Sequence, residues 1–203
     1  GYPVIGGALA SYAWTYTFLP FLIAIPQGFI ALFYLHCPEP QSKQALKDYL
    51  RDALLYIKSL KVLWLFSATV ITYILLYGAY LVYFSLLLGN RFHASPFTIG
   101  LFISILGVIT AATSLQVGRL SKRFSMVSLI IGAFASYALS MAIVPIMPNL
   151  WLCLLPNIIF GIAHGLNLPT LRVIAAYVTP LEHRAGFMSV HGTMIMLGMT
   201  IGP

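Results

Sequence analysis

Charged side chains are scarce in this chain, and acids are the scarcest of them. Only 7% of the 203 residues are charged, and four are Asp or Glu. Soluble domains carry roughly 25% charged residues, so this composition excludes an ordinary soluble protein. Because 60% of the residues are hydrophobic, we expect a protein embedded in the lipid bilayer.

The residue types that enzymes and metal proteins need are also few or badly spaced. Cys37 and Cys153 have neither disulfide nor metal-ligand spacing, and we expect both to be free thiols. The sequence offers no metal-ligand spacing, Ser/His/Asp set or Gly-rich phosphate loop, which disfavours an enzyme and a bound cofactor. All four acids fall in predicted loops, at Glu39, Asp48, Asp52 and Glu182. No predicted span therefore holds a carboxylate that could relay protons.

The uncharged intervals are repeatedly long enough for a helix of about 20 residues to cross the hydrocarbon core. The prolines of Cys37-Pro38-Glu39-Pro40 end one interval, and Met147-Pro148-Asn149 divides the longest one. Gly1–Ala13 is too short to cross and Ala185–Pro203 ends without a cap, so we expect one truncated and one incomplete span. The predicted fold class is an all-α integral membrane bundle. Five complete spans are predicted, over Thr15–His36, Val62–Leu88, Phe97–Val117 and the two parts of Phe124–Leu171.

Lysine and arginine orient these spans. Nine of the eleven Lys and Arg residues fall in loops on one side of the predicted bundle; Arg91 lies in an opposite loop and Arg172 lies inside a span. The positive-inside rule therefore places the basic loops in the cytoplasm. In the longest loop, the segment SKQALKDYLRDALLYIKSLK begins with Ser42 as a candidate N-cap and predicts an amphipathic helix on the membrane surface. Binding of a partner protein by this helix is the alternative.

Tyrosines inside a predicted span are candidates for a substrate path, because polar groups are costly in hydrocarbon. Tyr73, Tyr77 and Tyr80 follow helical spacing with Phe84 and predict one aromatic face. We expect this face to form a cavity wall. Aromatic packing is the alternative.

A second set of polar residues lies in the last complete span. Asn157 and His164 share a predicted face with Gly161, and Arg172 lies near that face. An arginine inside a span indicates a watery path or a partner, whereas snorkelling to the cytoplasmic surface is the alternative. For His164 the alternative is a packing histidine with its hydrogen bonds satisfied.

Small residues predict where helices approach closely. Gly161 and Gly165, and likewise Gly198 and Gly202, have the small-xxx-small spacing of close helix pairs, with static packing as the alternative to a moving contact. A longer stripe, predicted to face one neighbouring backbone, consists of Gly100, Ser104, Gly107, Ala111, Ser114 and Gly118.

Three segments resemble parts of the major facilitator superfamily. GRLSKRF at 118–124 is similar to the second copy of its basic loop motif. The block at 157–203, from NIIFGIAHG to GMTIGP, is similar to the tenth helix, its cytoplasmic loop and the eleventh helix of the drug:proton antiporter branch. GYPVIGG followed by Trp14 resembles the end of the fifth helix and the start of the sixth.

The resemblance implies two six-helix halves related as parallel repeats, so the Gly/Pro site near Pro3 should recur at Gly202-Pro203. It implies that 1–36 ends the N-terminal half with part of helix five and helix six. It also implies that 37–61 is a cytoplasmic central loop and that 62–203 holds helices seven to eleven. The implied cytoplasmic gate consists of Gly118, Lys122, Arg123 and Arg184. Helix hinges or packing contacts are implied at Pro3, Gly6, Gly7, Gly161, Gly165, Pro169, Gly198, Gly202 and Pro203.

By this resemblance we expect a secondary transporter that works by alternating access and exports drugs or other amphiphilic compounds in exchange for protons. The alternative is an uptake symporter or facilitator for a sugar or other metabolite, and a scaffold without transport is disfavoured by the polar groups in the spans. The expected partners are a small-molecule substrate, protons and the bilayer, with no nucleic acid and no cofactor. We expect a monomeric, multi-pass protein of the plasma or inner membrane, with the acid for proton coupling outside these residues.

Overall fold

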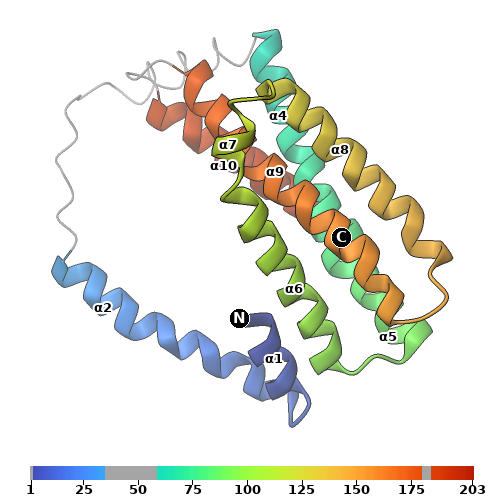
Figure 1. The fold of residues 1–203 in the computed structure, drawn as a ribbon. Coiled ribbons are helices and arrows are strands. Elements are labelled where there is room, and N and C mark those ends of the chain that lie inside the picture. The colour runs from blue at the N-terminus through green and yellow to red at the C-terminus, as the bar shows by residue number, and fades with distance from the viewer. Residues whose placement is uncertain (1, 35–58, 180–183) are drawn as a thin grey trace.

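A computed structural model of the chain describes residues 2–34, 59–179 and 184–203, and its regular structure in those ranges is helical (Figure 1). The predicted amphipathic helix of the 37–61 loop lies almost wholly outside them. The elements before that loop are α1 (Tyr2–Ala10), the 3₁₀ helix η1 (Trp14–Ile23) and α2 (Ala24–Tyr34). After it come α4 (Leu60–Tyr73), the π-helix η2 (Ile74–Phe84), α5 (Ser85–Phe92), α6 (Pro96–Ser114), α7 (Val117–Leu120), α8 (Met126–Ile143), η3 (Val144–Ile146), η4 (Trp151–Cys153), α9 (Leu154–Val178) and α10 (Arg184–Ile201).

Five helical runs of the described chain are long and apolar enough to cross a membrane, which confirms the predicted number of complete spans. Each run begins within two residues of its predicted start. α10 contains a shorter apolar helix. The five runs are Trp14–Tyr34, Leu60–Phe92, Pro96–Leu120, Met126–Ile146 and Trp151–Val178.

Serine caps start two of these runs. Ser95 Oγ accepts a hydrogen bond from Thr98 N at 3.2 Å, and Pro96 follows at the first helical position. Ser125 Oγ accepts one from Ser128 N at 3.1 Å at the start of α8. Both spans therefore begin where a side chain satisfies an amide that the helix leaves unpaired.

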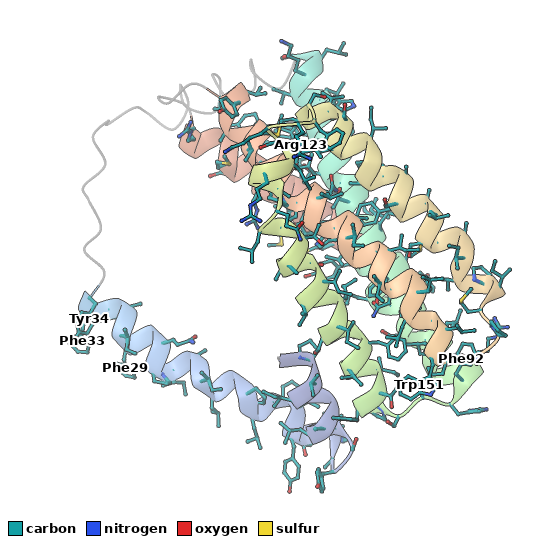
Figure 2. The ribbon with its side chains drawn as sticks, viewed as in Figure 1. Phe29, Phe33, Tyr34, Phe92, Arg123 and Trp151 are labelled. Carbon is teal, nitrogen blue, oxygen red and sulfur yellow. The ribbon has the colours of Figure 1, made fainter. Side chains whose placement is uncertain are left out.

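α9 is the central helix of the bundle. It packs between α6 and α8 and also contacts α4, while α10 packs on α4 and η2 (Figure 1). Half of the α9 span is buried, whereas none of the η1–α2 span is. α2 extends away from the bundle, and its Phe29 and Phe33 are exposed (Figure 2).

The two ends of the bundle differ in charge, as the topology prediction requires. Arg123 lies at one end, and Phe92 and Trp151 lie at the other (Figure 2). At the aromatic end, Arg91 donates a hydrogen bond to Pro145 O at 2.9 Å, and its guanidinium lies 5.3 Å from the centre of the Phe92 ring. A Trp and a cation–π pair at a span terminus are typical of a membrane interface.

Two apolar clusters fill the bundle. One lies toward the aromatic end and includes Tyr80, Phe84, Phe102, Tyr137 and Phe160. The other lies toward the basic end and includes Val62, Leu65, Phe66, Ile130, Leu171 and Phe187. α8 and α9 contribute to both clusters, whereas η2 contributes to the first and α4 to the second. The residues between the two clusters therefore come from the middle of these helices.

The π-helix changes the predicted aromatic face. A π-helix closes i to i+5 hydrogen bonds, so residues of η2 turn less per residue than the α-helical spacing assumes. Tyr80 therefore stacks on Phe84 and Phe160, with ring centres 4.8 and 4.5 Å apart, and is buried in the core. Tyr73 and Tyr77 form a separate pair 6.4 Å apart. The single stripe of four aromatic residues is thus two pairs.

The long stripe of small residues on α6 does not face one neighbour. Gly100 faces α1, where Pro3 O would clash with an added Cβ. Ser114 reaches α9, whereas Gly107 and Gly118 have open space where a Cβ would be. α6 lies between two different helices, so its two ends use different faces.

Candidate functional site

A polar layer lies between the two apolar clusters. Its members come from α4, α8, α9 and α10, and all are buried, although each carries a hydroxyl, amide, phenol or imidazole group. Such groups are stable inside a membrane protein only when they bond one another or the backbone. The layer consists of Thr69, Thr72, Tyr137, His164, Asn167, Thr170 and His191.

One hydrogen bond of the layer joins α4 to α10. Thr69 Oγ1 donates to Leu65 O in its own helix at 2.9 Å, and it also lies 3.1 Å from His191 Nε2. When the single hydroxyl proton is directed to Leu65 O, the Nε2–H tautomer of His191 is the donor in the second contact. The His191 ring also lies beside Phe66, with ring centres 6.2 Å apart.

A second hydrogen bond joins α4 to α9. Asn167 Nδ2 donates to Thr72 Oγ1 at 2.6 Å, while that hydroxyl donates to Ala68 O at 2.7 Å. Asn167 is completely buried, and its Oδ1 has no hydrogen-bond partner among the described residues. The amide oxygen is therefore an acceptor available to a donor that enters the layer.

A third hydrogen bond joins α8 to α9. The Tyr137 hydroxyl lies 2.7 Å from His164 Nδ1, and both side chains are buried. Phe160 lies against both rings, with centres 4.7 Å from Tyr137 and 6.4 Å from His164. His164 is thus held by a phenol and an aromatic wall, as expected for a histidine with satisfied packing.

Arg172 connects this layer to an exposed face of α9. Its side chain is exposed. Its positive charge lies close enough to Tyr73, His164 and His191 to interact with them electrostatically. Tyr77, partly buried, stands beside Tyr73. Arg172 and the tyrosine pair therefore lie where the buried layer meets the open side of the bundle.

Two other predicted path residues are enclosed by packing. Asn157 is completely buried, and its Nδ2 donates to Phe102 O at 2.9 Å, which ties α9 to α6. Tyr80 lies in the aromatic cluster described above, and its hydroxyl has no partner among the described residues. Neither side chain belongs to the polar layer.

The predicted glycine pairs of α9 and α10 lie at close helix contacts. An added Cβ at Gly165 would lie 2.6 Å from Thr110 O, and one at Gly161 would lie 2.9 Å from Ile109 Cγ2. On α10, a Cβ at Gly198 would lie 2.7 Å from Val70 O, and Gly202 lies against the Gly78 backbone of η2. Pro203 O accepts a hydrogen bond from the Tyr83 hydroxyl at 3.1 Å.

Pro169 leaves a specific backbone group unpaired inside α9. Because proline has no amide hydrogen, the carbonyl four residues earlier, Gly165 O, loses its helical partner. Ser114 Oγ of α6 donates to that carbonyl at 3.1 Å. One turn away, Thr110 Oγ1 donates to Gly161 O at 3.2 Å. The α6–α9 contact therefore supplies the hydrogen-bond donor that Pro169 cannot provide to Gly165 O.

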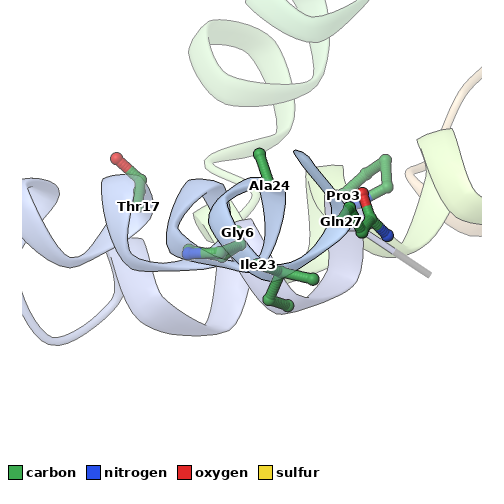
Figure 3. A pocket seen from close by; sticks show the side chains of 7 residues that line it. Pro3, Gly6, Thr17, Ile23, Ala24 and Gln27 are labelled. Carbon is green, nitrogen blue, oxygen red and sulfur yellow. The ribbon is translucent and has the colours of Figure 1, made fainter. Parts of the chain in front are cut away.

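The segment around Pro3 borders an apolar groove of about 470 Å³. The groove lies between α1 and the η1–α2 segment, and Pro3, Gly6 and Thr17 are among the residues that line it (Figure 3). Gly7 faces α6 instead, where an added Cβ would lie 2.6 Å from Pro96 O.

The residues assigned to a cytoplasmic gate lie at the basic end of the bundle. Arg184 Nη2 donates to Ala176 O at 3.1 Å, so its cation lies in the last turn of α9, where the helix dipole is negative. Gly118 lies in α7, and Lys122 and Arg123 lie in the turn that follows and are exposed.

Sequence reasoning missed Tyr137, Asn167, Thr69, Thr72 and Thr170 as members of the layer. Tyr137 and Asn167 lie in an interval without charge, and polar side chains there are a usable signal. The threonines give a weaker signal, because a threonine can satisfy its hydroxyl on its own helix.

These features define a multi-pass helical membrane protein with polar groups at the middle of its spans and cations gathered at one end. A family model described as Major Facilitator Superfamily matches residues 1–203. The chain therefore belongs to the major facilitator superfamily, whose members are secondary transporters of small molecules. A search of curated proteins finds no match.

Proposed function

We propose that this protein exports amphiphilic small molecules in exchange for protons, and that the polar layer together with Arg172 and the Tyr73–Tyr77 pair forms the substrate path of this half. The observation that carries the proposal is the composition of the layer and its mouth. Most hydrogen-bonding groups of the described layer already bond one another or the backbone, which leaves the Asn167 Oδ1 acceptor, the Arg172 cation and several aromatic rings for a ligand. Ligand sites with mostly apolar walls and few polar groups suit bulky amphiphiles better than polyols.

Substrate would enter from the exposed face at Arg172 and exchange hydrogen bonds with the layer. Asn167 is the central residue of this proposal, because its Oδ1 has no partner among the described residues while its Nδ2 holds Thr72. A bound donor would satisfy Oδ1 without breaking the contact between α9 and α4. Binding at Oδ1 would then leave this helix contact in place, while the other hydrogen bonds of the layer remain available for exchange with the substrate.

The test is transport by the intact transporter in vesicles with an imposed pH gradient and a fluorescent amphiphile. We expect Asn167→Ala to raise the apparent KM several-fold, and the matched control Thr193→Ala to leave it unchanged. Thr193 is exposed on α10 and donates to Ser189 O in its own helix at 3.2 Å.

The direction of flux distinguishes the proposed function from uptake. Export that requires an opposing proton gradient supports the proposal. Cotransport of a sugar with protons, or flux that ignores the gradient, would show that the protein is an uptake symporter or a facilitator. Unchanged KM values in Asn167→Ala would instead remove the polar layer from the substrate path.

A further inference from the structure

A second candidate site lies at the basic end of the bundle, far from the polar layer. A cavity of about 430 Å³ opens there beside α7 and the turn that follows. Three of the five residues that line it carry a positive charge. The lining residues are Gln116, Arg119, Leu120, Lys122 and Arg123.

The backbone around this cavity is an ordered turn. Ser121 N donates to Val117 O at 2.8 Å, and Phe124 N donates to Leu120 O at 2.9 Å. Val117 is buried, and α7 contacts α9. The backbone that carries the three cations is therefore ordered before any ligand binds, which reduces the ordering cost of binding an anion.

Exposed apolar side chains flank the cavity-lining segment in the sequence. Leu115 precedes it with 84% of its surface exposed, and Phe124 follows it with 54% exposed. Val127, in the first turn of α8, is also exposed. Because the apolar run Pro96–Leu120 ends here and Met126–Ile146 begins here, we expect these residues to lie at the level where phospholipid headgroups meet acyl chains. The surface thus presents cations that can contact an anionic headgroup, and next to them apolar side chains that can contact acyl chains.

We propose that this cavity binds the headgroup of an anionic phospholipid from the leaflet that faces the basic loops. Basic pockets between helices at the cytoplasmic side suit anionic headgroups, because juxtamembrane cations are attracted to that leaflet. None of the four acids of the chain lies among the described residues, so no described carboxylate competes for these cations. The site lies outside the polar layer, and its lipid binding can be measured whatever the direction of transport.

The experiment measures lipid binding by the intact transporter purified in a neutral detergent. Dioleoyl phosphatidylglycerol and dioleoyl phosphatidylcholine are titrated separately, with retained lipid followed by native mass spectrometry. We expect phosphatidylglycerol to bind more tightly than phosphatidylcholine. Lys122→Gln and Arg123→Gln should each weaken its binding about fivefold, which corresponds to about 1 kcal/mol per cation near the surface.

Two controls keep the result specific to this cavity. Arg91→Gln removes a cation at the opposite end of the bundle and should leave phosphatidylglycerol binding unchanged. Arg119→Lys combined with Arg123→Lys retains the charge and should preserve most of the affinity, which separates charge from folding. sn-Glycerol 3-phosphate supplies the same phosphate without acyl chains and should compete only weakly.

Equal binding of the two lipids would overturn the proposal, as would an unchanged affinity in both single variants. Competition by sn-glycerol 3-phosphate as strong as that of the lipid would show that the cavity is a site for a soluble phosphate. Loss of affinity in the charge-preserving variant would show that binding depends on the shape of the arginine side chains and not on their charge, which would contradict the proposal.

Discussion

Ser114 is predicted to stabilise the bundle because its hydroxyl donates a hydrogen bond to Gly165 O, the carbonyl that Pro169 leaves without a helical donor. In Ser114→Ala, Gly165 O loses the donor that lies 3.1 Å away. A buried carbonyl without a partner costs about 1–3 kcal/mol, and in hydrocarbon no water replaces the lost donor. We therefore expect Ser114→Ala to lower the free energy of unfolding by about 1–3 kcal/mol.

Thr110 provides a matched control on the same helix. Its hydroxyl donates to Gly161 O at 3.2 Å, but Gly161 O keeps its ordinary helical donor at Gly165 N. Thr110→Ala therefore removes an additional bond and leaves no carbonyl unpaired. Interhelical hydrogen bonds of this kind average about 0.6 kcal/mol in membrane proteins, so its cost should be clearly smaller.

A double-mutant cycle separates the effect of the Ser114–Gly165 hydrogen bond at the proline site from that of ordinary packing. Pro169→Ala restores an amide hydrogen four residues after Gly165, so Ser114→Ala in that background should cost only about 0.6 kcal/mol. The measurement is unfolding in mixed micelles by increasing SDS, followed by circular dichroism. If the effects of Ser114→Ala and Pro169→Ala are simply additive, this role of Ser114 is wrong.

Three further outcomes follow from the site and the topology. Arg172→Gln should reduce transport of anionic amphiphiles more than that of cationic ones, with partial rescue by Arg172→Lys, and equal losses for both charge classes would argue against a role in recognition. Asn157→Ala should lower stability by only about 0.6 kcal/mol, since it removes an interhelical hydrogen bond while Phe102 O keeps its helical donor at Leu106 N, and should leave the apparent KM unchanged, whereas Tyr77→Ala should raise KM at little cost in stability. In a variant without native cysteines, Ser95→Cys should react with an impermeant maleimide in intact cells and Ser121→Cys should not; the opposite pattern would reverse the proposed topology.

The spans could be predicted because charge and proline mark their ends. A single pair of prolines, or one short segment such as Met147-Pro148-Asn149, ends a helix whatever it packs against. Ser95 and Ser125 cap their helices through hydrogen bonds to amides three residues later, which is an equally local effect. Such signals need no knowledge of the neighbouring helices, and the five observed runs begin close to the predicted positions.

The partners inside the bundle could not be predicted in the same way. The α-helical spacing of Tyr73, Tyr77 and Tyr80 assumes about 100° per residue, and the π-helix from Ile74 to Phe84 changes that angle. Asn157 and Asn167 are both asparagines of one helix, yet one bonds α6 and the other α4. Which neighbour each side chain meets depends on the packing of the bundle, and no local pattern carries that information.

The polar layer is the part of the bundle that a substrate can rearrange most easily. Three hydrogen bonds join helices across it, Thr69–His191, Thr72–Asn167 and Tyr137–His164. At an average of about 0.6 kcal/mol each, they contribute about 2 kcal/mol together. The apolar clusters on either side contain Phe, Leu and Tyr side chains that are almost completely buried, and truncating one such residue costs about 2–5 kcal/mol. A ligand that supplies equivalent hydrogen bonds can therefore exchange partners in the layer while both clusters stay closed. We expect the helices to move as units about the layer, because separating either cluster costs more than the ligand's hydrogen bonds return.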